Sequence, residues 1–147
     1  MDAAIDGVHV ADTPSGQVPV VLVGVAETTD VLPIFVAFEE ALAIRRGLDA
    51  EDTPRPFTHD LLLDAVEELG GRIEAVEITG LEEGTYIAEL RLATPRGSVT
   101  LDARPSDSLA LAARTGIPIT VTESVFDAGK RGTDAFTDLR DIREVTE

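Results

Sequence analysis

Residues 72–102, RIEAVEITGLEEGTYIAELRLATPRGSVTLD, decide the fold class of this chain. β-Branched and other apolar residues are frequent over 72–79, 85–93 and 98–102, and each segment has the length of a strand. Two clusters of turn-forming residues, Glu82-Glu83-Gly84 and Pro95-Arg96-Gly97, separate the three segments,. Connections this short join antiparallel neighbours. The stretch therefore predicts an antiparallel meander.

The segment directly before the meander predicts a helix over 58–69 with well-marked boundaries. Thr58 is a favourable N-cap, Asp60 places a negative charge in the first turn, and Gly70-Gly71 ends the helix,. Phe57 and Leu62 have the spacing of a hydrophobic staple. The buried stripe is expected to consist of Leu62, Ala65, Val66 and Leu69.

The rest of the chain predicts a mixed architecture. Two further helices are expected, over 37–48 and from Ser106 to Gly116, and strands are expected over 3–10, 18–26, 31–36 and 117–121,. Because strands and helices alternate without the regular pattern of a parallel sheet, and hairpins dominate, we expect an α+β fold. It would contain a mostly antiparallel sheet and three main helices.

Composition narrows the chemistry and the setting. The chain has 147 residues, 28 acidic against 12 basic side chains, a net charge of −16 and one lysine. This acidic surface predicts a halophilic protein of a salt-rich cytoplasm, although an ordinary acidic bacterial protein is the alternative. The absence of cysteine excludes disulfides, thiolate metal sites and cysteine nucleophiles. The most apolar stretch, 18–26, is too short to cross a bilayer, so we expect a cytoplasmic location and no membrane contact.

Two similar segments stand directly before predicted helices. RPFTHD (55–60) and DARPSD (102–107) each combine an arginine, a proline, a hydroxyl and a carboxylate. Arg55 and Arg104 can grip a phosphate in a bidentate manner. A helix that begins at Ser106 also offers free N–H groups to an anion. We therefore expect the two segments to converge on one ligand.

The same segments hold groups for acid–base and metal chemistry. His59 carries an imidazole, the group used most often as a general acid or base. The other histidine, His9, lies in a predicted strand and is interpreted as structural. Carboxylate oxygens suit one or two Mg²⁺ or Mn²⁺ ions, and no organic cofactor is expected. The carboxylates available are Asp60, Asp102, Asp107 and Glu40.

Four motifs, in order, closely resemble the bifunctional nuclease domain family: 32–36 (LPIFV), 40–44 (EALAI), 55–62 (RPFTHDLL) and 102–108 (DARPSDS). The resemblance covers about residues 5–129. It implies a wedge-shaped α+β domain over 1–129, a homodimer, and a groove that acts on DNA and RNA. Residues 130–147 fall outside it as an acidic tail, in which Thr133 is expected to cap a short docked helix with Phe136, Leu139 and Ile142.

This sequence departs from the family pattern at three places. Phe57 stands where leucine is usual, Ala37 replaces a common glycine, and Ser108 replaces a common alanine. None of these changes removes a candidate catalytic group.

Residue chemistry and resemblance together predict a metal-assisted nuclease that hydrolyses phosphodiester bonds in DNA and RNA. The expected roles are catalysis by His59, Asp60 and Asp107, substrate binding by Arg55, Arg104, Ser106 and Thr58, and metal binding by Asp102, Asp107 and Glu40.

A non-catalytic alternative stays open, in which the chain is a dimeric interaction or regulatory module. Thr58 and Ser106 would then serve as helix caps, and Asp60 and Asp107 would complement helix dipoles. Salt bridges of Arg55 with Asp107, and of Arg104 with Asp60, would brace the two loops.

Bulk electrostatics oppose nucleic-acid binding. A net charge of −16 repels polyanions, and molar salt removes most of the counterion-release contribution,. Five Phe, one Tyr and no Trp leave few rings for stacking,. Binding therefore requires a locally positive groove, for which the candidates are Arg45, Arg46, Arg55 and Arg104.

Overall fold

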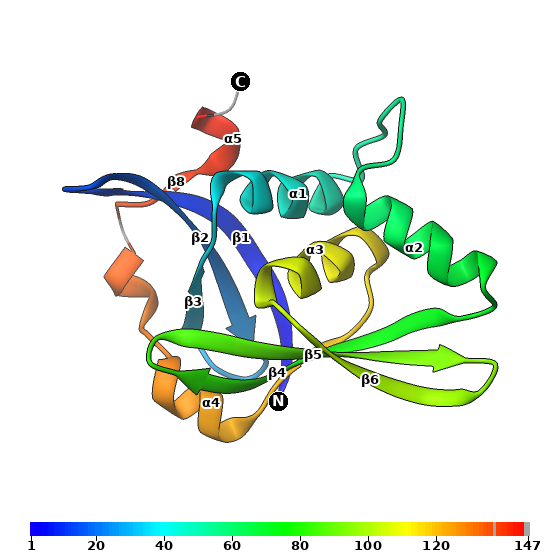
Figure 1. The fold of residues 1–147 in the computed structure, drawn as a ribbon. Coiled ribbons are helices and arrows are strands. Elements are labelled where there is room, and N and C mark those ends of the chain that lie inside the picture. Colours follow the sequence, from blue (N-terminus) through cyan, green and yellow to red (C-terminus); the bar gives the residue numbers. More distant parts are fainter. Residues whose placement is uncertain (137, 146–147) are drawn as a thin grey trace.

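One open sheet runs through the computed structural model, which describes residues 1–136 and 138–145 (Figure 1). Its strands are β1 (Asp2–Thr13), β2 (Gly16–Val25), β3 (Val31–Phe35), β4 (Arg72–Glu82), β5 (Thr85–Thr94), β6 (Gly97–Ala103), β7 (Ile119–Val121) and β8 (Arg140–Asp141). The spatial order is β3-β2-β1-β7-β4-β5-β6, and β8 adds to β1. All pairs are antiparallel except β4 with β7. The predicted α+β class with a mostly antiparallel sheet is confirmed.

Helices lie at the three predicted places and at two others. They are α1 (Phe38–Leu48), α2 (Thr58–Glu68), α3 (Pro105–Thr115), α4 (Glu123–Gly129) and α5 (Ile142–Val145), with a 3₁₀ turn at Thr133–Phe136. The expectation of three main helices therefore missed the two short ones. Within 1–136 and 138–145, no helix combines the length and the apolar character that crossing a membrane demands.

The meander formed by β4, β5 and β6 is present as predicted, with strands longer than expected. The tight turn between β4 and β5 depends on Glu83 and Gly84, whose φ angles are 51° and 82°. Two positive φ angles in succession give the primed turn whose twist matches that of a hairpin. Leu90 and Leu92 of β5 turn their side chains toward the core.

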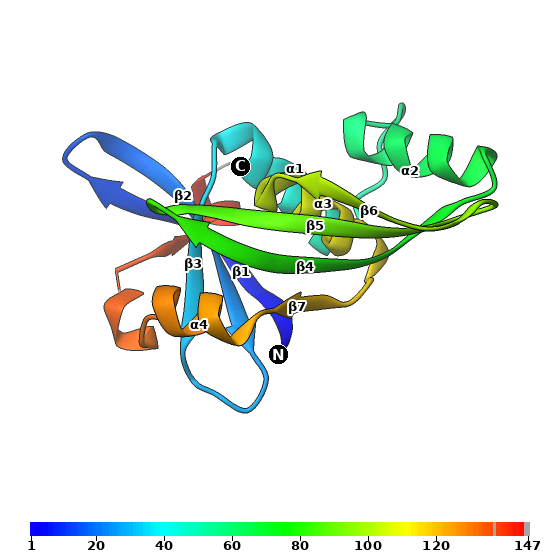
Figure 2. The same ribbon diagram turned by 60° about the horizontal axis from the view of Figure 1, so that its bottom comes forward.

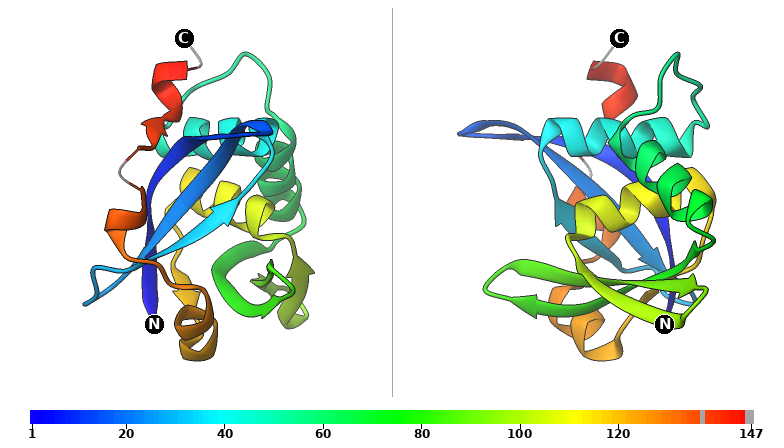
Figure 3. Two further views of the ribbon diagram at one scale, coloured as in Figure 1. Left: turned by 90° about the vertical axis from the view of Figure 1, so that its left-hand side faces the viewer. Right: turned by 45° about the vertical axis from the view of Figure 1, so that its right-hand side comes forward.

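The sheet consists of two halves that stand at a steep angle, and α3 lies between them (Figures 1 and 2). The halves, β3-β2-β1 and β4-β5-β6, are joined through β7. Both views of Figure 3 show α3 inside this angle with α1 against it. Leu109, Ala110, Leu111 and Ala112 of α3 are all buried. Because α3 is surrounded, the residues at its start have a fixed position.

Close contact between α1 and α3 requires a glycine. Ala41, Ile44 and Gly47 form the buried face of α1. A Cβ atom at Gly47 would lie 2.8 Å from the backbone nitrogen of Arg114 and 2.9 Å from the Cβ of Ala113. The two helix backbones therefore approach as closely as they can at this point.

The prediction for α2 is wrong in two respects. Phe57, not Thr58, is the N-cap residue, and its N–H donates to the Asp60 carboxylate at 3.3 Å. The buried stripe also differs, since Leu62 and Leu69 are 42% and 79% exposed. Of the predicted stripe, Val66 does pack against the core, and Leu63 packs there beside it. The helix is rotated this way because its first turn directs His59 and Asp60 toward α3.

The C-terminal residues do not form the single short helix that was expected. A 3₁₀ turn at Thr133–Phe136 is followed by β8, which pairs with β1, and then by α5. Ile142 is fully buried in the core. Strand pairing and this buried side chain outweigh the weak helical pattern of the segment. The division of the chain at residue 129 stays a prediction, but the backbone of Arg131 already pairs with that of Val31.

We expect Gly47→Ala to destabilise the protein. Alanine normally favours a helix over glycine, by about 1 kcal/mol. Here the added Cβ meets the Arg114 backbone, which cannot yield, and overpacking of this kind costs about 1–3 kcal/mol,. Denaturant unfolding at constant KCl measures the change. Asp64→Ala, at an exposed position of α2, is the control and should raise the unfolding free energy slightly; a stabilised Gly47→Ala variant would contradict the close packing.

Candidate active site

The site is centred on Arg104, the N-cap residue of α3. Its guanidinium makes a bidentate pair with Asp107 one turn later, with Nε 2.9 Å from Oδ2 and Nη2 3.1 Å from Oδ1. Nη1 lies 2.7 Å from Oε2 of Glu40 in α1. Two carboxylates thus hold one guanidinium, yet 66% of the Arg104 side chain is exposed. The charged fork is fixed in place and open to solvent.

His59 joins the same group from α2. Its Nε2 lies 3.0 Å from Oδ1 of Asp107, and the imidazole is largely buried. An ionised carboxylate only accepts hydrogen bonds, so Nε2 carries a proton and donates. In the neutral ring this leaves Nδ1 with the free lone pair. Asp107 therefore sets both the orientation and the tautomer of His59.

The Asp107 carboxylate is held in its ionised form. Partial burial opposes ionisation, but hydrogen bonds from Arg104 and from His59 outweigh it, so the pKa of Asp107 lies below its ordinary value. The hydrogen bond with Asp107, followed by the charges of Asp107 and Glu40, raises the pKa of Arg104. Both partners therefore remain charged through the neutral range.

Ser106 does not cap α3, contrary to prediction. Pro105 and Ser106 are the first residues inside the helix, and the Ser106 hydroxyl donates to Oε2 of Glu40 at 3.1 Å. The other oxygen of Glu40 accepts the backbone N–H of Ala37 at 2.7 Å. Ser108, which replaces a common alanine, donates its hydroxyl to the Arg104 carbonyl at 3.0 Å. Glu40 thus links α1 to the start of α3.

A hollow of about 510 Å³ opens between α1, α2 and the start of α3. His59, Asp107, Arg104 and Thr58 all line it. So does Arg46, whose guanidinium lies 4.0 Å from the ring centroid of Phe57. The two proline-containing segments therefore do converge, through four of their predicted site residues.

Four predicted site residues do not line this hollow, and Ser106 is one of them, since its hydroxyl is hydrogen-bonded to Glu40. Asp60 pairs with Arg114 at 2.9 Å, at the far end of α3. Arg55 is exposed, and its guanidinium donates to the neighbouring carbonyl of Pro54 at 3.4 Å. Asp102 lies on β6, on the other side of Arg104, and lines a second hollow.

The expected salt bridges between the two loops, Arg55 with Asp107 and Arg104 with Asp60, are therefore not formed. Arg104 bonds Asp107 rather than Asp60, and Asp60 bonds Arg114. Of the arginines expected in a positive groove, Arg46 and Arg104 line the hollow. Arg45 is instead held by carboxylates at the end of α1.

The carboxylates do not form a preassembled metal site. Within residues 1–136 and 138–145, no three His, Asp or Glu side chains converge as metal ligands. Glu40 and Asp107 both bind the same arginine, and a cation there would compete with a guanidinium. In this structure Glu40 and Asp107 therefore serve as partners of Arg104.

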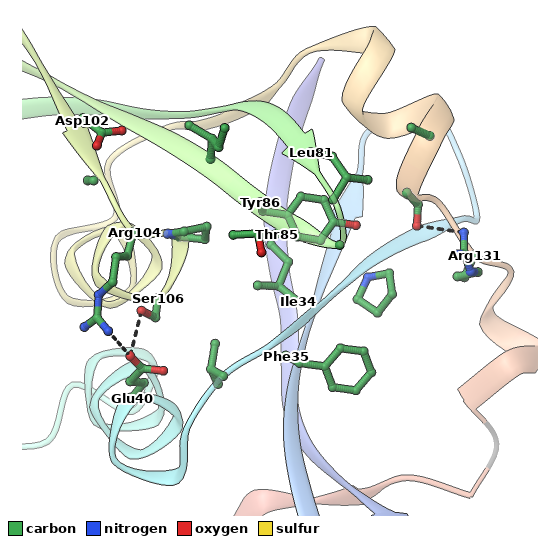
Figure 4. A pocket seen from close by; sticks show the side chains of 18 residues that line it. Ile34, Phe35, Glu40, Leu81, Thr85, Tyr86, Asp102, Arg104, Ser106 and Arg131 are labelled. Carbon is green, nitrogen blue, oxygen red and sulfur yellow. Dashed lines mark hydrogen bonds and ion pairs between the residues drawn. The ribbon is translucent and has the colours of Figure 1, made fainter.

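The second hollow, of about 590 Å³, adjoins the first at Arg104 and Glu40 (Figure 4). Phe35, Tyr86 and Arg131 line it. The sequence patterns predicted no role for any of them. Phe35 lies within the motif at 32–36, and that motif could have pointed to a role for it. Arg131 belongs to the segment that was predicted as a tail, so the sequence offered no such signal for it.

Comparison with known proteins agrees with this arrangement. The model of the bifunctional nuclease domain matches residues 20–132, more than three quarters of the chain. The chain belongs to the bifunctional nuclease domain family. All the residues of both hollows lie inside the matched range.

The chain is similar to a bacterial protein over most of its length and to plant nucleases over a shorter stretch. An uncharacterized protein of Mycobacterium tuberculosis is 39% identical over 124 residues, which cover 84% of this chain and 73% of the relative. Bifunctional nuclease 2 of Arabidopsis thaliana is 28% identical over 110 residues, 67% of this chain and 33% of the relative. Bifunctional nuclease 1 of Oryza sativa subsp. japonica is 28% identical over 97 residues, which cover 64% of this chain and 29% of the relative. The chain thus matches about a third of each plant nuclease.

Stability should depend on Asp107 in a pH-dependent way. Its pKa is depressed in the folded state, so the ionised form stabilises the fold above the unfolded-state pKa,. This contribution is lost as the pH falls through the lower, folded-state pKa. Asp107→Asn should therefore differ most from the wild type at neutral pH and converge with it in acid. Unfolding at constant ionic strength tests this.

Asp64→Asn, which removes one exposed charge of α2, is the control for that experiment. A stability difference between Asp107→Asn and the wild type that stays constant from neutral pH into acid would contradict the ion pairs described.

Proposed function

We propose that this protein is a nuclease that hydrolyses phosphodiester bonds in DNA and RNA, with its active site in the hollow of Arg104, Asp107 and His59. One observation supports this above all: a fixed, exposed guanidinium and an imidazole share one carboxylate at the rim of one hollow. Phosphate binding and proton transfer are the two tasks of phosphodiester hydrolysis. The names of the plant relatives support the same activity.

Arg104 is proposed to bind the phosphate that is attacked. A guanidinium has five N–H donors, and the contacts with Asp107 and Glu40 use three of them,. Two donors remain for the oxygens of a substrate. Because the carboxylates already orient the fork, little ordering is needed when the charge of the transition state develops.

His59 is proposed to act as the general base or acid. With Nε2 bound to Asp107, Nδ1 of the neutral ring can take a proton from water and later return it to the leaving oxygen,. The ionised Asp107 stabilises the imidazolium that forms between these steps. Thr58, which lines the same hollow, is proposed to bind substrate through its hydroxyl.

A role of Mg²⁺ or Mn²⁺ remains part of the proposal. It rests on the oxygen chemistry of Glu40, Asp102 and Asp107 and not on a preassembled site,. Assays are therefore run with each ion and with EDTA. The proposed setting is a salt-rich cytoplasm, because at about 1 M salt the Debye length is only ~3 Å and self-repulsion of a −16 chain is screened,.

We also propose that two copies form a wedge-shaped homodimer. Leu61 and Leu62 of α2 and its C-cap residue Leu69 are 58%, 42% and 79% exposed. Val99 and Leu101 of β6 are partly exposed as well. Large apolar side chains that are left exposed are typical of protein interfaces. The non-catalytic dimeric module predicted as an alternative would use the same surface.

His59→Gln should abolish most cleavage of single-stranded DNA and RNA. Loss of a general acid or base lowers the rate by about 10²- to 10⁴-fold. His9→Gln, in β1, is the matched control and should cleave normally. Thermal unfolding of each variant separates loss of chemistry from loss of fold. Unchanged cleavage by a folded His59→Gln variant would sink the proposed mechanism and favour the non-catalytic module.

The double variant Leu61→Gln, Leu69→Gln should be monomeric, whereas the wild type sediments as a dimer. The reason is that the two substitutions remove exposed apolar area from the proposed interface,. Leu48→Gln, a partly exposed leucine of α1, is the control and should stay dimeric. Analytical ultracentrifugation in high KCl gives the masses. A monomeric wild type, or a double variant that remains dimeric, would contradict this interface.

A further inference from the structure

The second hollow, the 590 Å³ space beyond Arg104, has the size and the lining of a ligand site. It lies between β3, the hairpin of β4 and β5, the start of α3 and the end of α4. Figure 4 shows Arg104 at one end and Arg131 at the other, with Phe35 and Tyr86 between them. Its volume falls in the usual range of small-molecule sites, about 300–1,000 Å³,.

Two rings line this hollow. Phe35 ends β3 and is 59% exposed, which is unusual for the largest apolar side chain of a strand. Tyr86 is half-buried, and burial raises the pKa of its hydroxyl. Gly129, at the end of α4, has no side chain where a Cβ would collide with the Tyr86 hydroxyl. The end of α4 can therefore pack directly against the Tyr86 side chain.

Arg131 brings a positive charge that no carboxylate of the described residues pairs with. Its Nη1 donates to the carbonyls of Gly129 and Lys130, at 3.2 Å and 2.7 Å. Among residues 1–136 and 138–145, no carboxylate lies within ion-pair distance of it. In a chain with 28 acidic residues, a guanidinium held by backbone carbonyls at the edge of a hollow is available to an anion,.

We propose that this hollow binds one nucleotide of a single-stranded nucleic acid, directly beside the bond that is cleaved. The base lies against Phe35 and Tyr86, and the phosphates on its two sides lie on Arg104 and Arg131. The assignment rests on the proposed function, because Arg104 is there the ligand of the attacked phosphate. A duplex does not fit, since its bases are paired and stacked and cannot reach an aromatic wall.

The carboxylates of the hollow favour the same arrangement. Glu40 is paired with Arg104 and accepts a hydrogen bond from the Ser106 hydroxyl. Asp102 is exposed on β6 and would repel a phosphate, so a base is the part of a nucleotide that belongs beside it. Stacking also remains effective in molar salt, where counterion release contributes little. This is how a strongly acidic protein can hold a polyanion at one place.

Tyr86 offers a built-in measurement. It is the only tyrosine, and the chain has no tryptophan, so all tyrosine emission arises from this hollow. The probe is adenosine 3′,5′-bisphosphate, a nucleotide with a phosphate on each side, titrated in high KCl. We expect saturable quenching, weaker binding of adenosine, and no quenching by inorganic phosphate. Free N-acetyltyrosinamide, titrated in the same way, corrects for absorption by the probe.

Two pairs of variants test the assignment. Phe35→Ala should raise the Kd of the bisphosphate by about 5- to 150-fold, the range for loss of one stacking ring. Its control, Phe38→Ala, removes a partly exposed ring that lines neither hollow. Arg131→Gln should raise the Kd of the bisphosphate about tenfold and leave that of adenosine unchanged. Arg96→Gln, in the turn between β5 and β6, is its control.

The outcomes separate this inference from the proposed function. Normal cleavage by His59→Gln, together with saturable quenching that depends on Phe35, would remove the proposed chemistry and leave the nucleotide site standing. Cleavage that requires His59, with no quenching of Tyr86 or with an unchanged Kd in Phe35→Ala, would overturn the nucleotide site alone. An unchanged Kd of the bisphosphate in Arg131→Gln would also overturn it.

Discussion

Burial of α3 in the angle of the sheet is the constraint on which the rest of the structure depends. The sheet turns sharply at β7, and the apolar side chains of α3 fill the space inside the turn. Because the helix is packed on nearly all sides, its first residues cannot shift. Arg104 and Asp107 gain their fixed geometry from this packing, and α1 and α2 add Glu40 and His59 by docking on the same helix.

The candidate site reconciles a strongly acidic chain with the anionic substrate that is proposed for it. Most arginines with a nearby carboxylate are used as braces, as in the pairs of Arg114 with Asp60 and Arg143 with Asp49. Arg104 is also paired, but it stays exposed and keeps free donors. Arg46, stacked on Phe57, and Arg131, held by carbonyls, add positive charge along the same path. Local geometry, rather than net charge, decides where a phosphate can bind.

The motifs shared with the bifunctional nuclease domain family gather around Arg104, although they are far apart in sequence. The segment 32–36 forms a wall of the second hollow, and the first residue of the segment 40–44 binds the guanidinium. The segments 55–62 and 102–108 supply His59 and the Arg104–Asp107 pair. A family defined by sequence thus coincides with one continuous surface that runs through two hollows.

The sequence by itself determined the α+β class, the meander, the three main helices and most of the site's residue types. Alternation, turn residues and helix signals are local, so they can be read without the fold. It could not decide that Asp60 faces Arg114 while Asp107 takes both Arg104 and His59, or that Arg55 stays outside. Those choices depend on how α2 is rotated about its own axis relative to α3. Neighbouring residues of a helix point about 100° apart, so a small rotation changes which side chain faces α3. Only the tertiary structure, by placing β7 between two hairpins and α3 between two half-sheets, brought Phe35, Tyr86 and Arg131 to the other side of Arg104.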